Sequence, residues 1–553
     1  MLLAILASLG WLLPSRFYPW PGFHQDALIT LVSLVCGGGI LLMSRRAWYL
    51  PSIGCVFLVL ASVPIFQWIN GQIFFFGAAS ISTAYVLGFA AVVVFAARAE
   101  EIDPYFFLDR LFFSIGLAAI VTVWVQLYQW LGLVSPDDWW AAGVDAVRPS
   151  GNFSQPNHAA TFLLWGLCAV AWASWRRHIG WFCAVLMAMY LLFGVTLTGS
   201  RTAWIGVAAV VTAVFWWRKY WMVQRVPWVV LGLAGYFFAL RLALERSGAM
   251  STDLLSESTV NIRWLIWQVA LDGLRVNPWR GYGWDQVYNV QLLMADKPSG
   301  LDDVFSSSHN LFLDIFLFMG LPLGILLICS LVLWVMNVFS KVKCASHAIL
   351  FIFIIPVAVH SMFEYPLQYA HLLLPTGWII GSLHAKVFKK SSSDFVVPYF
   401  LVALFYCLML ALFLTICSDY SKIEKASRSI RSQVANNSLL RSAAPEVLLL
   451  NQLSSQLELM RMPDLGSDLN AEQLDMIEGV ALLPTSRNLL VKAAKLLAIN
   501  HRTEQAIWIL RRYCGVASEL SCKYGRERWN RLAKTQPEIA RIPWTSGLAE
   551  ASR

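Results

Sequence analysis

The sequence predicts an all-α protein that crosses a membrane many times, and three observations lead to this fold class. The 553-residue chain is 58% hydrophobic and only 14% charged, which is unlike an ordinary soluble enzyme. Apolar stretches recur along it, each long enough for the roughly 20 helical residues that a bilayer core requires. The 42 Lys and Arg exceed the 33 Asp and Glu, an excess that membrane proteins concentrate in cytoplasmic loops. This composition excludes a disordered or fibrous chain, and the charge does not imply a nucleic-acid partner.

Hydropathy and loop charges predict about thirteen spanning helices. They lie near residues 1–14, 26–43, 51–68, 77–97, 111–131, 158–175, 179–198, 202–217, 226–243, 310–337, 348–365, 371–388 and 395–417. The first segment has the weakest signal because Pro14 cuts it short.

Basic residues gather in alternate loops, and this asymmetry predicts the orientation. One set of loops holds pairs such as Arg45 and Arg46. The opposite short loops hold only Arg16, Arg148 and Arg201. The amino terminus is therefore expected in the cytoplasm and, after an odd number of crossings, the C-terminal tail outside. For a Gram-negative bacterium this means a multi-pass inner-membrane protein with a periplasmic tail.

The composition changes abruptly after the last apolar segment. Leu and Ala recur at helical spacing among charged residues in 487–498 and 504–512. These stretches predict helix pairs that resemble tetratricopeptide hairpins, although no clean period of about 34 residues is visible. We therefore expect a transmembrane domain over 1–420, which includes a large periplasmic loop at 244–309, and a periplasmic α-helical domain over 421–553.

Eight of the ten cysteines lie in or beside apolar segments, without the spacing of a zinc site. Cys514 and Cys522 differ because both fall in the exported tail, eight positions apart. They either form a disulfide or remain two thiols, and the sequence leaves both open.

His309 lies in Ser306-Ser-Ser-His-Asn-Leu-Phe-Leu-Asp314, at the outer end of an apolar helix. An imidazole titrates near neutral pH, so His309 is suited to take a proton from a hydroxyl group. A histidine beside serines and an asparagine can equally belong to a helix cap. The segment by itself supports both interpretations.

Arg201 lies in Thr198-Gly-Ser-Arg-Thr-Ala-Trp204, which joins two spanning helices by almost no loop. The cation is therefore expected at or just below the outer membrane surface, where burial is costly. It either faces a polar cavity or an anion, or extends to the lipid headgroups.

The segment Gly151-Asn-Phe-Ser-Gln-Pro-Asn-His158 predicts a specified turn that carries several amides and an imidazole, among them Gln155. In its simplest interpretation it is only a loop, in which Asn157 caps the next helix and His158 lies at the membrane interface.

Two further segments stand out in the loop 244–309. Residues 261–274 predict an amphipathic helix on the membrane surface, from which Arg263 points into a cavity. Arg280 follows in Asn277-Pro-Trp-Arg-Gly-Tyr-Gly-Trp284, whose paired glycines predict a tight turn but do not match a dinucleotide-binding fingerprint.

The segment from His360 to His371 brings two histidines, Glu364 and two tyrosines, including Tyr365, to another outer turn. A carboxylate at the end of an apolar helix needs a partner, and we expect an arginine from a loop.

Five motifs together resemble those of a known family. They are Gly151-Asn-Phe-Ser-Gln-Pro-Asn-His158, Thr198-Gly-Ser-Arg-Thr-Ala-Trp204, Asn261-Ile-Arg-Trp264, Asn277-Pro-Trp-Arg-Gly-Tyr-Gly-Trp284 and Ser308-His-Asn-Leu311. In this order the chain resembles a PglL-type bacterial O-oligosaccharyltransferase of the O-antigen ligase and polymerase (Wzy) superfamily. The resemblance covers most of 1–420, and the Gln-Pro-Asn-His peptide and long tail favour the protein-glycosylating branch.

The resemblance implies transfer of an oligosaccharide from undecaprenyl diphosphate to Ser or Thr of exported, often pilin-like, proteins. It assigns His309 as the base and Arg201 and Arg263 as the residues that bind the donor diphosphate. Gln155 and Tyr365 match positions that the family uses near its site. The remaining candidates for the site are Arg280, Glu364 and His158. No metal or cofactor is expected, because arginine can neutralise the leaving group.

Two alternatives remain. The acceptor could be a sugar hydroxyl, which would make the chain an O-antigen ligase or polymerase. From another class, the chain could be a polysaccharide-lipid transporter or flippase, although it has no evident internal repeat and its unusual polar residues gather on one face rather than at the midplane.

Overall fold

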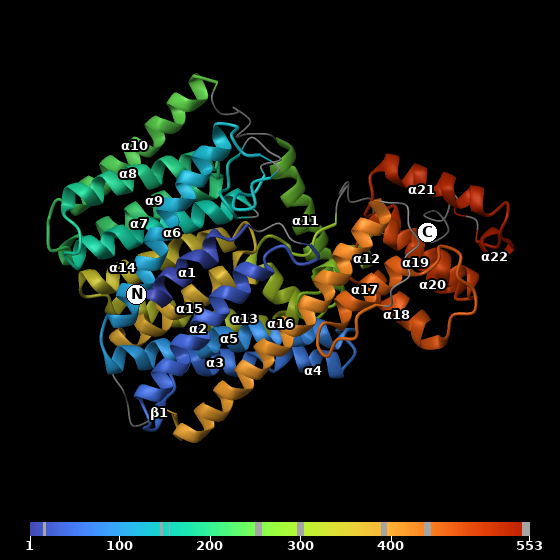
Figure 1. Cartoon of the computed structure of the whole chain (residues 1–553), viewed down its shortest axis with the longest axis horizontal. Helices are drawn as coiled ribbons and strands as arrows, with labels where there is room; N and C mark the ends of the chain where they lie inside the picture. The colour runs from blue at the N-terminus through green and yellow to red at the C-terminus, as the bar shows by residue number, and fades with distance from the viewer. Residues whose placement is uncertain are drawn as a thin grey trace. The chain divides into compact units, whose positions relative to one another are not determined.

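The computed structural model describes the chain except for residues 15–17, 136, 144–147, 154, 249–256, 296–303, 389–394, 436–443, 543 and 545–553. Arg16, used above for the orientation, lies outside the described residues. The described part is mostly helical (Figure 1), which confirms the all-α class. Its one strand pair, β1 (Trp48–Tyr49) and β2 (Val396–Val397), is antiparallel and places Trp48 opposite Val397.

The structure consists of two compact units. The first comprises residues 1–61, 84–256 and 330–412. The second comprises residues 62–83, 257–329 and 413–553. The sequences of three helices are divided between the units, namely α5 (Phe76–Ile102), α13 (Leu311–Lys341) and α16 (Tyr399–Ala435).

The first unit is a bundle of apolar helices. They are α1 (Leu2–Leu12), α2 (Phe23–Met43), α3 (Ser52–Leu60), α6 (Phe106–Trp130), α7 (Pro156–Trp175), α8 (Trp181–Leu197), α9 (Arg201–Trp216), α10 (Val226–Arg246), α14 (Ala345–Ser361) and α15 (Ala370–Val387). The central helix is α7, since 72% of its apolar window is buried. The indole of Trp165 in α7 stacks on Phe353 of α14 with ring centroids 4.4 Å apart, and its Nε1 donates to the Phe353 carbonyl at 2.9 Å.

Several helices are suited to cross a bilayer, which makes the chain a multi-pass membrane protein. Eight described segments are both long and apolar enough to span one. The apolar window of α16 is only 6% buried, and lipid is the environment that such a surface favours. Every predicted spanning segment coincides with a helix, and 51–68 is divided into α3 and α4 (Val63–Ile69). The number of crossings stays a prediction.

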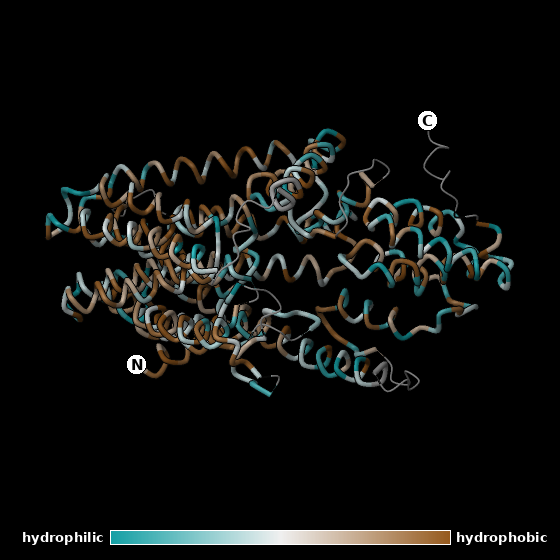
Figure 2. The backbone as a smooth tube through the Cα atoms, turned by 90° about the horizontal axis from the view of Figure 1, so that it is seen from above, coloured by the Kyte–Doolittle hydropathy of each residue, from teal (hydrophilic) through white to brown (hydrophobic). Residues whose placement is uncertain are grey.

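The second unit combines short helices with the C-terminal tail. Its helices are α4, α11 (Glu257–Val276), α12 (Val287–Met294), α17 (Asn451–Arg461), α18 (Ala471–Ala481), α19 (Arg487–Ile499), α20 (Thr503–Tyr513), α21 (Glu519–Leu532) and α22 (Pro537–Ala540). The two helices expected at 487–498 and 504–512 are confirmed as α19 and α20, which pack together. Figure 2 shows hydrophilic and hydrophobic residues alternating along the tail, as expected for amphipathic helices with a buried stripe.

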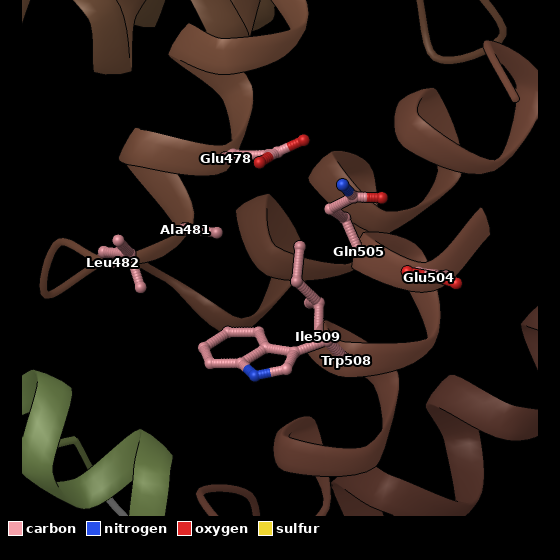
Figure 3. Close-up of a pocket in the computed structure, with 7 residues that line it drawn as sticks. All are labelled: Glu478, Ala481, Leu482, Glu504, Gln505, Trp508 and Ile509. Carbon is pink, nitrogen blue, oxygen red and sulfur yellow. The ribbon is translucent and has the colours of Figure 1, made fainter. Parts of the chain in front are cut away.

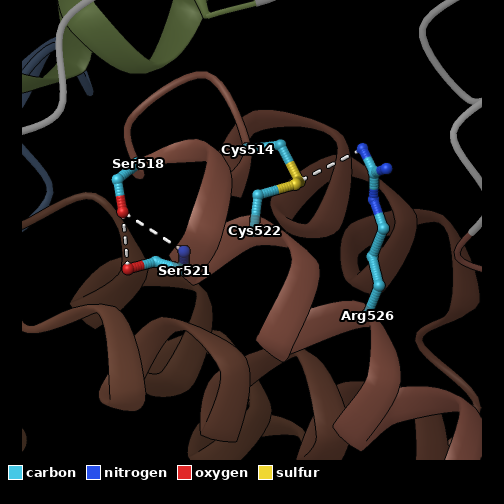
Figure 4. The surroundings of a disulfide bond; sticks show 5 residues. All are labelled: Cys514, Ser518, Ser521, Cys522 and Arg526. Carbon is cyan, nitrogen blue, oxygen red and sulfur yellow. Dashed lines mark hydrogen bonds between the residues drawn. A yellow bond between two sulfur atoms is a disulfide. The ribbon is translucent and has the colours of Figure 1, made fainter.

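A disulfide joins Cys514 to Cys522, so the question that the sequence left open is answered (Figure 4). Cys514 directly follows α20, and Cys522 lies in the first turn of α21. Ser518 caps α21 by accepting a hydrogen bond from the Ser521 amide at 3.2 Å. The disulfide thus holds the end of α20 against the start of α21.

The helix α13 is broken at Gly320, where φ is +77°. The break exposes backbone groups that the turn 277–284 uses. The Tyr282 amide donates to the Leu317 carbonyl at 2.7 Å, and the Leu321 amide donates to the Pro278 carbonyl at 2.7 Å. A Cβ atom at Gly320 would lie 2.3 Å from the Trp279 carbonyl oxygen, so only glycine allows this close approach.

Candidate active site

The loop before α13 presents His309 in an unusual conformation. Its φ is +57°, in the left-handed region that few residues other than glycine adopt. The buried Asp314 carboxylate holds this loop by accepting from the Ser307 hydroxyl at 2.6 Å and the Ser308 amide at 2.7 Å. The Ser307 hydroxyl in turn accepts from the His309 amide at 3.0 Å. His309 therefore occupies a position that the surrounding hydrogen bonds define.

Two further contacts fix the same loop. The Trp267 indole of α11 donates to the Ser308 carbonyl at 3.0 Å. Asn310 accepts from the amides of Phe312 and Leu313 at 3.1 and 3.2 Å and so caps α13. The capping role that the sequence allowed for His309 thus belongs to Asn310, and His309 immediately precedes the cap.

Arg263 lies in α11, four residues before Trp267, and is half-buried. Residues four apart share one face of a helix. Arg263 therefore belongs to the face of α11 that carries the contact to the His309 loop. The structure confirms a helix over the predicted 261–274 and extends it in both directions.

Arg280 lies in the turn that docks on the broken α13, and its side chain is exposed. The predicted tight turn is confirmed, because Gly281 and Gly283 have φ of +66° and +102°. A Cβ atom at Gly281 would lie 2.5 Å from the Leu317 carbonyl oxygen. The turn needs glycine at this position, and it leaves Arg280 on the surface.

Asp285 is an acid near this site that sequence analysis missed. Its side chain keeps contact with solvent, although protein surrounds it on most sides. Desolvation, with a smaller contribution from the charge of Asp314, raises the pKa of Asp285 to about 7. Its φ of +61° is a second departure from ordinary backbone geometry in the same unit. The sequence alone indicated neither the raised pKa of Asp285 nor its left-handed backbone.

In the first unit, the start of α7 contacts the turn that carries Glu364 and Tyr365. The helix α7 begins at Pro156 with Gln155 at its N-cap position, and Gln155 makes no side-chain capping bond. Asn157 therefore does not cap the helix. Its amide instead donates to the Glu364 carboxylate at 3.3 Å. The expected pairing of Glu364 with an arginine stays a prediction.

His158 is almost completely buried, with 1% of its surface exposed, so protein encloses its side chain. Its position at the membrane interface stays a prediction. Its ring centroid lies 5.3 Å from that of His360 and 4.6 Å from that of Tyr369. Neither ring nitrogen of His158 has a hydrogen-bond partner among the described residues. The ring of Tyr365 stacks on Tyr369 at 6.2 Å. The turn at 360–371 thus packs against α7.

A buried carboxylate that sequence analysis missed completes this polar cluster. Asp26 of α2 accepts from the Tyr85 hydroxyl at 2.7 Å and lies 2.7 Å from the His371 imidazole. It also accepts from the His371 amide at 2.9 Å. Buried ionisable groups in membrane helices are costly, and functional sites are where they are commonly retained. A lone acid near the start of an apolar segment was the available signal.

Arg201 is the first residue of α9 and is half-buried. The turn before it depends on Gly199, whose φ is +57°. Ser200 caps the helix by accepting from the Ala203 amide at 3.3 Å. Of the candidate residues, Arg201, Gln155, His158, Glu364 and Tyr365 lie in the first unit, whereas Arg263, Arg280 and His309 lie in the second.

The tail carries a separate pocket of about 350 Å³ between α18 and α20 (Figure 3). Its lining combines the Trp508 indole and aliphatic side chains with two carboxylates. The lining residues are Glu478, Ala481, Leu482, Glu504, Gln505, Trp508 and Ile509. Burial raises the pKa of Glu478, and the neighbouring Arg502 opposes that shift. Such a pocket suits an amphipathic peptide better than a phosphate.

Three family profiles match parts of the chain. Residues 149–172 match the protein glycosylation ligase profile, and residues 184–328 match the O-antigen ligase profile. Residues 348–516 match the C-terminal part of the virulence factor membrane-bound polymerase family. The first match contains Gln155 and His158, and the second contains Arg201, Arg263 and His309.

Two curated relatives come from Acinetobacter baylyi. A general O-oligosaccharyltransferase is 28% identical over 534 residues, which cover 92% of this chain and 90% of the relative. A ComP-specific O-oligosaccharyltransferase is 26% identical over 369 residues, or 64% of each chain. By these matches the chain is similar to membrane glycosyltransferases of the O-antigen ligase superfamily. The likeness to O-oligosaccharyltransferases agrees with the resemblance that the sequence motifs indicate.

Proposed function

We propose that this protein moves a preassembled oligosaccharide en bloc from undecaprenyl diphosphate to Ser or Thr of periplasmic or pilin-like proteins. The observation that carries this proposal is the 28% identity, over 92% of the chain, to a general O-oligosaccharyltransferase. A lipid-linked donor requires a membrane-embedded enzyme, and the multi-pass helices meet that requirement. The partners are the lipid-linked glycan, the acceptor protein and the surrounding membrane lipids.

His309 is the proposed base. It accepts the proton of the acceptor hydroxyl while that oxygen attacks the anomeric carbon of the donor. The bond between that carbon and the phosphate oxygen breaks, and undecaprenyl diphosphate leaves with the bonding electrons. A positioned base of this kind contributes on the order of 10² to 10⁴ in rate. The hydrogen bonds that define the His309 loop support this role, because catalysis depends on a fixed orientation.

Arg201 and Arg263 are proposed to bind the donor diphosphate. Guanidinium groups bind phosphate oxygens through paired hydrogen bonds and stabilise the negative charge that develops on the leaving group. Gln155 and Tyr365 are assigned to hydrogen bonding with donor or acceptor. Arg280 is a secondary candidate.

Glu364 and His158 are the other secondary candidates for this site, and both are buried. Because Asn157 contacts Glu364 and His158 lies inside α7, their proposed part is to shape the polar cluster of the first unit rather than to touch the reacting atoms.

The proposed location is the bacterial inner membrane, with a cytoplasmic amino terminus and about thirteen crossings. The Cys514–Cys522 disulfide supports a periplasmic tail, because disulfides persist in oxidising compartments and are rare in the cytoplasm. The functional division follows the sequence, with a transferase domain over 1–420, including a periplasmic loop at 244–309, and a periplasmic tetratricopeptide-like domain over 421–553.

The tail is proposed to recruit acceptor proteins. The pocket between α18 and α20 supports this role, since an indole beside Glu504 and Glu478 favours a peptide that carries both apolar and basic side chains. This proposal assigns to the tail a contribution to acceptor binding and none to donor binding.

An O-antigen ligase or polymerase is the second candidate function. The matches of 184–328 and 348–516 to ligase and polymerase profiles favour it. The acceptor would then be a sugar hydroxyl, and the chemistry at His309 would be the same. A polysaccharide-lipid transporter is less well supported, because the matched profiles and relatives are ligases, polymerases and oligosaccharyltransferases.

The deciding experiment is transfer in vitro from a lipid-linked oligosaccharide to a pilin-like acceptor by the purified protein, read by intact mass. We expect a gain of one glycan on Ser or Thr, which His309→Ala abolishes. His501→Ala is a matched control, since His501 is also left-handed but is exposed in the tail. Transfer only to lipid A core, or extension of the lipid-linked glycan, would favour the ligase or polymerase instead.

A further inference from the structure

Two glutamines of α6 hold the turn at 149–153, which precedes α7. Gln129 donates from Nε2 to the Gly151 carbonyl at 2.7 Å, and its Oε1 accepts from the Gly151 amide at 2.9 Å. Gln126, three residues earlier, donates from Nε2 to the Pro149 carbonyl at 3.1 Å. Both glutamines are buried, although α6 is an apolar candidate span. Polar side chains are costly in such a span and commonly mark functional sites there.

Gln129 also ties this turn to the segment before it. Its Nε2 donates to the Ala142 carbonyl at 2.9 Å. The Ala142 amide in turn donates to the side-chain oxygen of Asn152 at 2.9 Å. The φ of Gly151 is +62°, and a Cβ atom there would lie 2.8 Å from Cγ2 of Thr122 in α6. The turn is therefore held against α6 by a hydrogen-bond network and by a close approach that glycine allows.

Gln155 follows this turn and keeps hydrogen-bonding capacity. Pro156 comes next as the first residue of α7 and fixes where the helix begins. The side-chain oxygen of Gln155 is buried, and none of the residues that the structure describes donates a hydrogen bond to it. A buried acceptor without a donor is costly. A bound group that donates a hydrogen bond to Gln155 would therefore be favoured.

We propose that Gln129 is a positioning residue that orients Gln155, through the 149–153 turn, toward the acceptor protein. The inference rests on the proposed function, which gives Gln155 hydrogen bonds with donor or acceptor, and it chooses the acceptor. The protein glycosylation ligase profile matches residues 149–172, whereas the O-antigen ligase and polymerase profiles match other segments. The enzymes with these profiles differ in their acceptors, so this turn is where a protein acceptor would be recognised.

The test is the kinetics of transfer by the full-length protein from a lipid-linked oligosaccharide to a pilin-like acceptor, with each concentration varied in turn. Gln129→Met nearly keeps the size of the side chain and removes its hydrogen bonds to Gly151 and Ala142. We expect the KM for acceptor to rise about tenfold, with the KM for donor unchanged. A purely structural role would instead lower kcat and raise both KM values together. An unchanged KM for acceptor in a folded Gln129→Met would overturn the proposal.

Gln155→Ala tests whether Gln129 acts through Gln155. If it does, the double variant raises the KM for acceptor no further than Gln155→Ala alone, because both changes interrupt the same contact. Effects that multiply would overturn the positioning role. Ser114→Ala is the matched control, since it also removes a buried hydroxyl of α6, whose bond to the Arg110 carbonyl lies within that helix. An equal rise in KM for this control would also count against the proposal.

Gly151→Ala covers the case in which Gln129→Met does not fold. It displaces the turn without changing Gln129, because the added Cβ atom presses on Cγ2 of Thr122. We expect the same selective rise in the KM for acceptor. Adding Thr122→Ser removes that methyl group and should lower the KM again. A normal KM for acceptor in Gly151→Ala would contradict the importance given to the position of the turn.

The proposed function fails separately, if the wild type transfers glycan only to a sugar acceptor. The assignment of Gln155 to a protein acceptor then fails as well, and the KM for that sugar in Gln129→Met decides whether the glutamine positions the site. The inference fails alone, if the wild type glycosylates protein and Gln129→Met does so with an unchanged KM for acceptor.

Discussion

At the residue scale, the geometry of His309 depends on Asp314. A left-handed conformation costs a residue with a side chain roughly 1 to 3 kcal/mol. Hydrogen bonds to a charged acceptor contribute about 1.5 to 3 kcal/mol each, and Asp314 accepts two from the Ser307 hydroxyl and Ser308 amide. The carboxylate can therefore offset the backbone cost and hold the loop at His309 in this conformation.

We expect Asp314→Asn to lower kcat for glycan transfer by about tenfold or more, because a misplaced base loses much of its advantage. Binding of the donor should change little, since the Asp314 carboxylate accepts its hydrogen bonds from Ser307 and Ser308 of the same loop. Steady-state kinetics with varied donor concentration separate the two effects. Asp272→Asn is the control, as Asp272 lies in α11 and pairs with the exposed Arg275. An unchanged kcat in Asp314→Asn would contradict the role given to this carboxylate.

Some individual residues of the site could be selected from the sequence, and others could not. His309, Arg201 and Gln155 could be selected because each is a polar residue at the end of an apolar segment. Asp26 gave one signal, as an acid near the start of an apolar segment, but its role depends on His371, which is distant in the chain. Tertiary contacts gave this residue its significance, and a single sequence does not display such contacts.

At the element scale, helices were predictable and their interruptions were not. Hydropathy located the segment 310–337, but the structure divides it at Gly320. The break depends on the turn at 277–284, which supplies the hydrogen-bond partners for Leu317 and Leu321. A glycine followed by Pro322 in an apolar run was a signal of a break, although it did not identify what would dock there.

The disulfide between α20 and α21 leads to a prediction for the tail. It closes a short loop, because Cys514 and Cys522 are eight residues apart. Cross-links of this size contribute roughly 2 to 3 kcal/mol by restricting the unfolded chain. The variant with Cys514→Ser and Cys522→Ser should therefore unfold in the tail at lower temperature, as followed by limited proteolysis with increasing heat.

Cys183→Ser is the control for that prediction, since Cys183 is a free, exposed thiol in α8. Reductant should destabilise the tail of the wild type as much as the two substitutions do. The same reductant should not change the double variant, which has no disulfide to reduce. Equal protease resistance of reduced and oxidised wild type would contradict a stabilising role for the disulfide.

At the scale of the whole molecule, composition and hydropathy were sufficient for the all-α membrane class and for the location of the helices. The division into two units was not predicted. The expected boundary near residue 420 follows the change in composition, whereas the second compact unit also contains 257–329. The hydrophobic cluster of the tail includes Tyr288 and Leu292 of α12, and that contact joins segments distant in sequence.

This shared cluster affects how the tail must be tested. Deleting residues 425–553 should reduce transfer to protein more than donor binding, if the tail recruits acceptors. The deletion also removes the partners of Tyr288 and Leu292, so an equal loss of glycan transfer and of donor binding would indicate a role in folding.

Trp508→Ala avoids this problem, because Trp508 lines the α18–α20 pocket and is only partly buried. We expect this variant to raise the KM for acceptor protein severalfold, with the KM for donor unchanged. Leu520→Ala, at an exposed position in α21 outside the pocket, should change neither. If Trp508→Ala leaves the KM for acceptor unchanged, recruitment through this pocket is wrong.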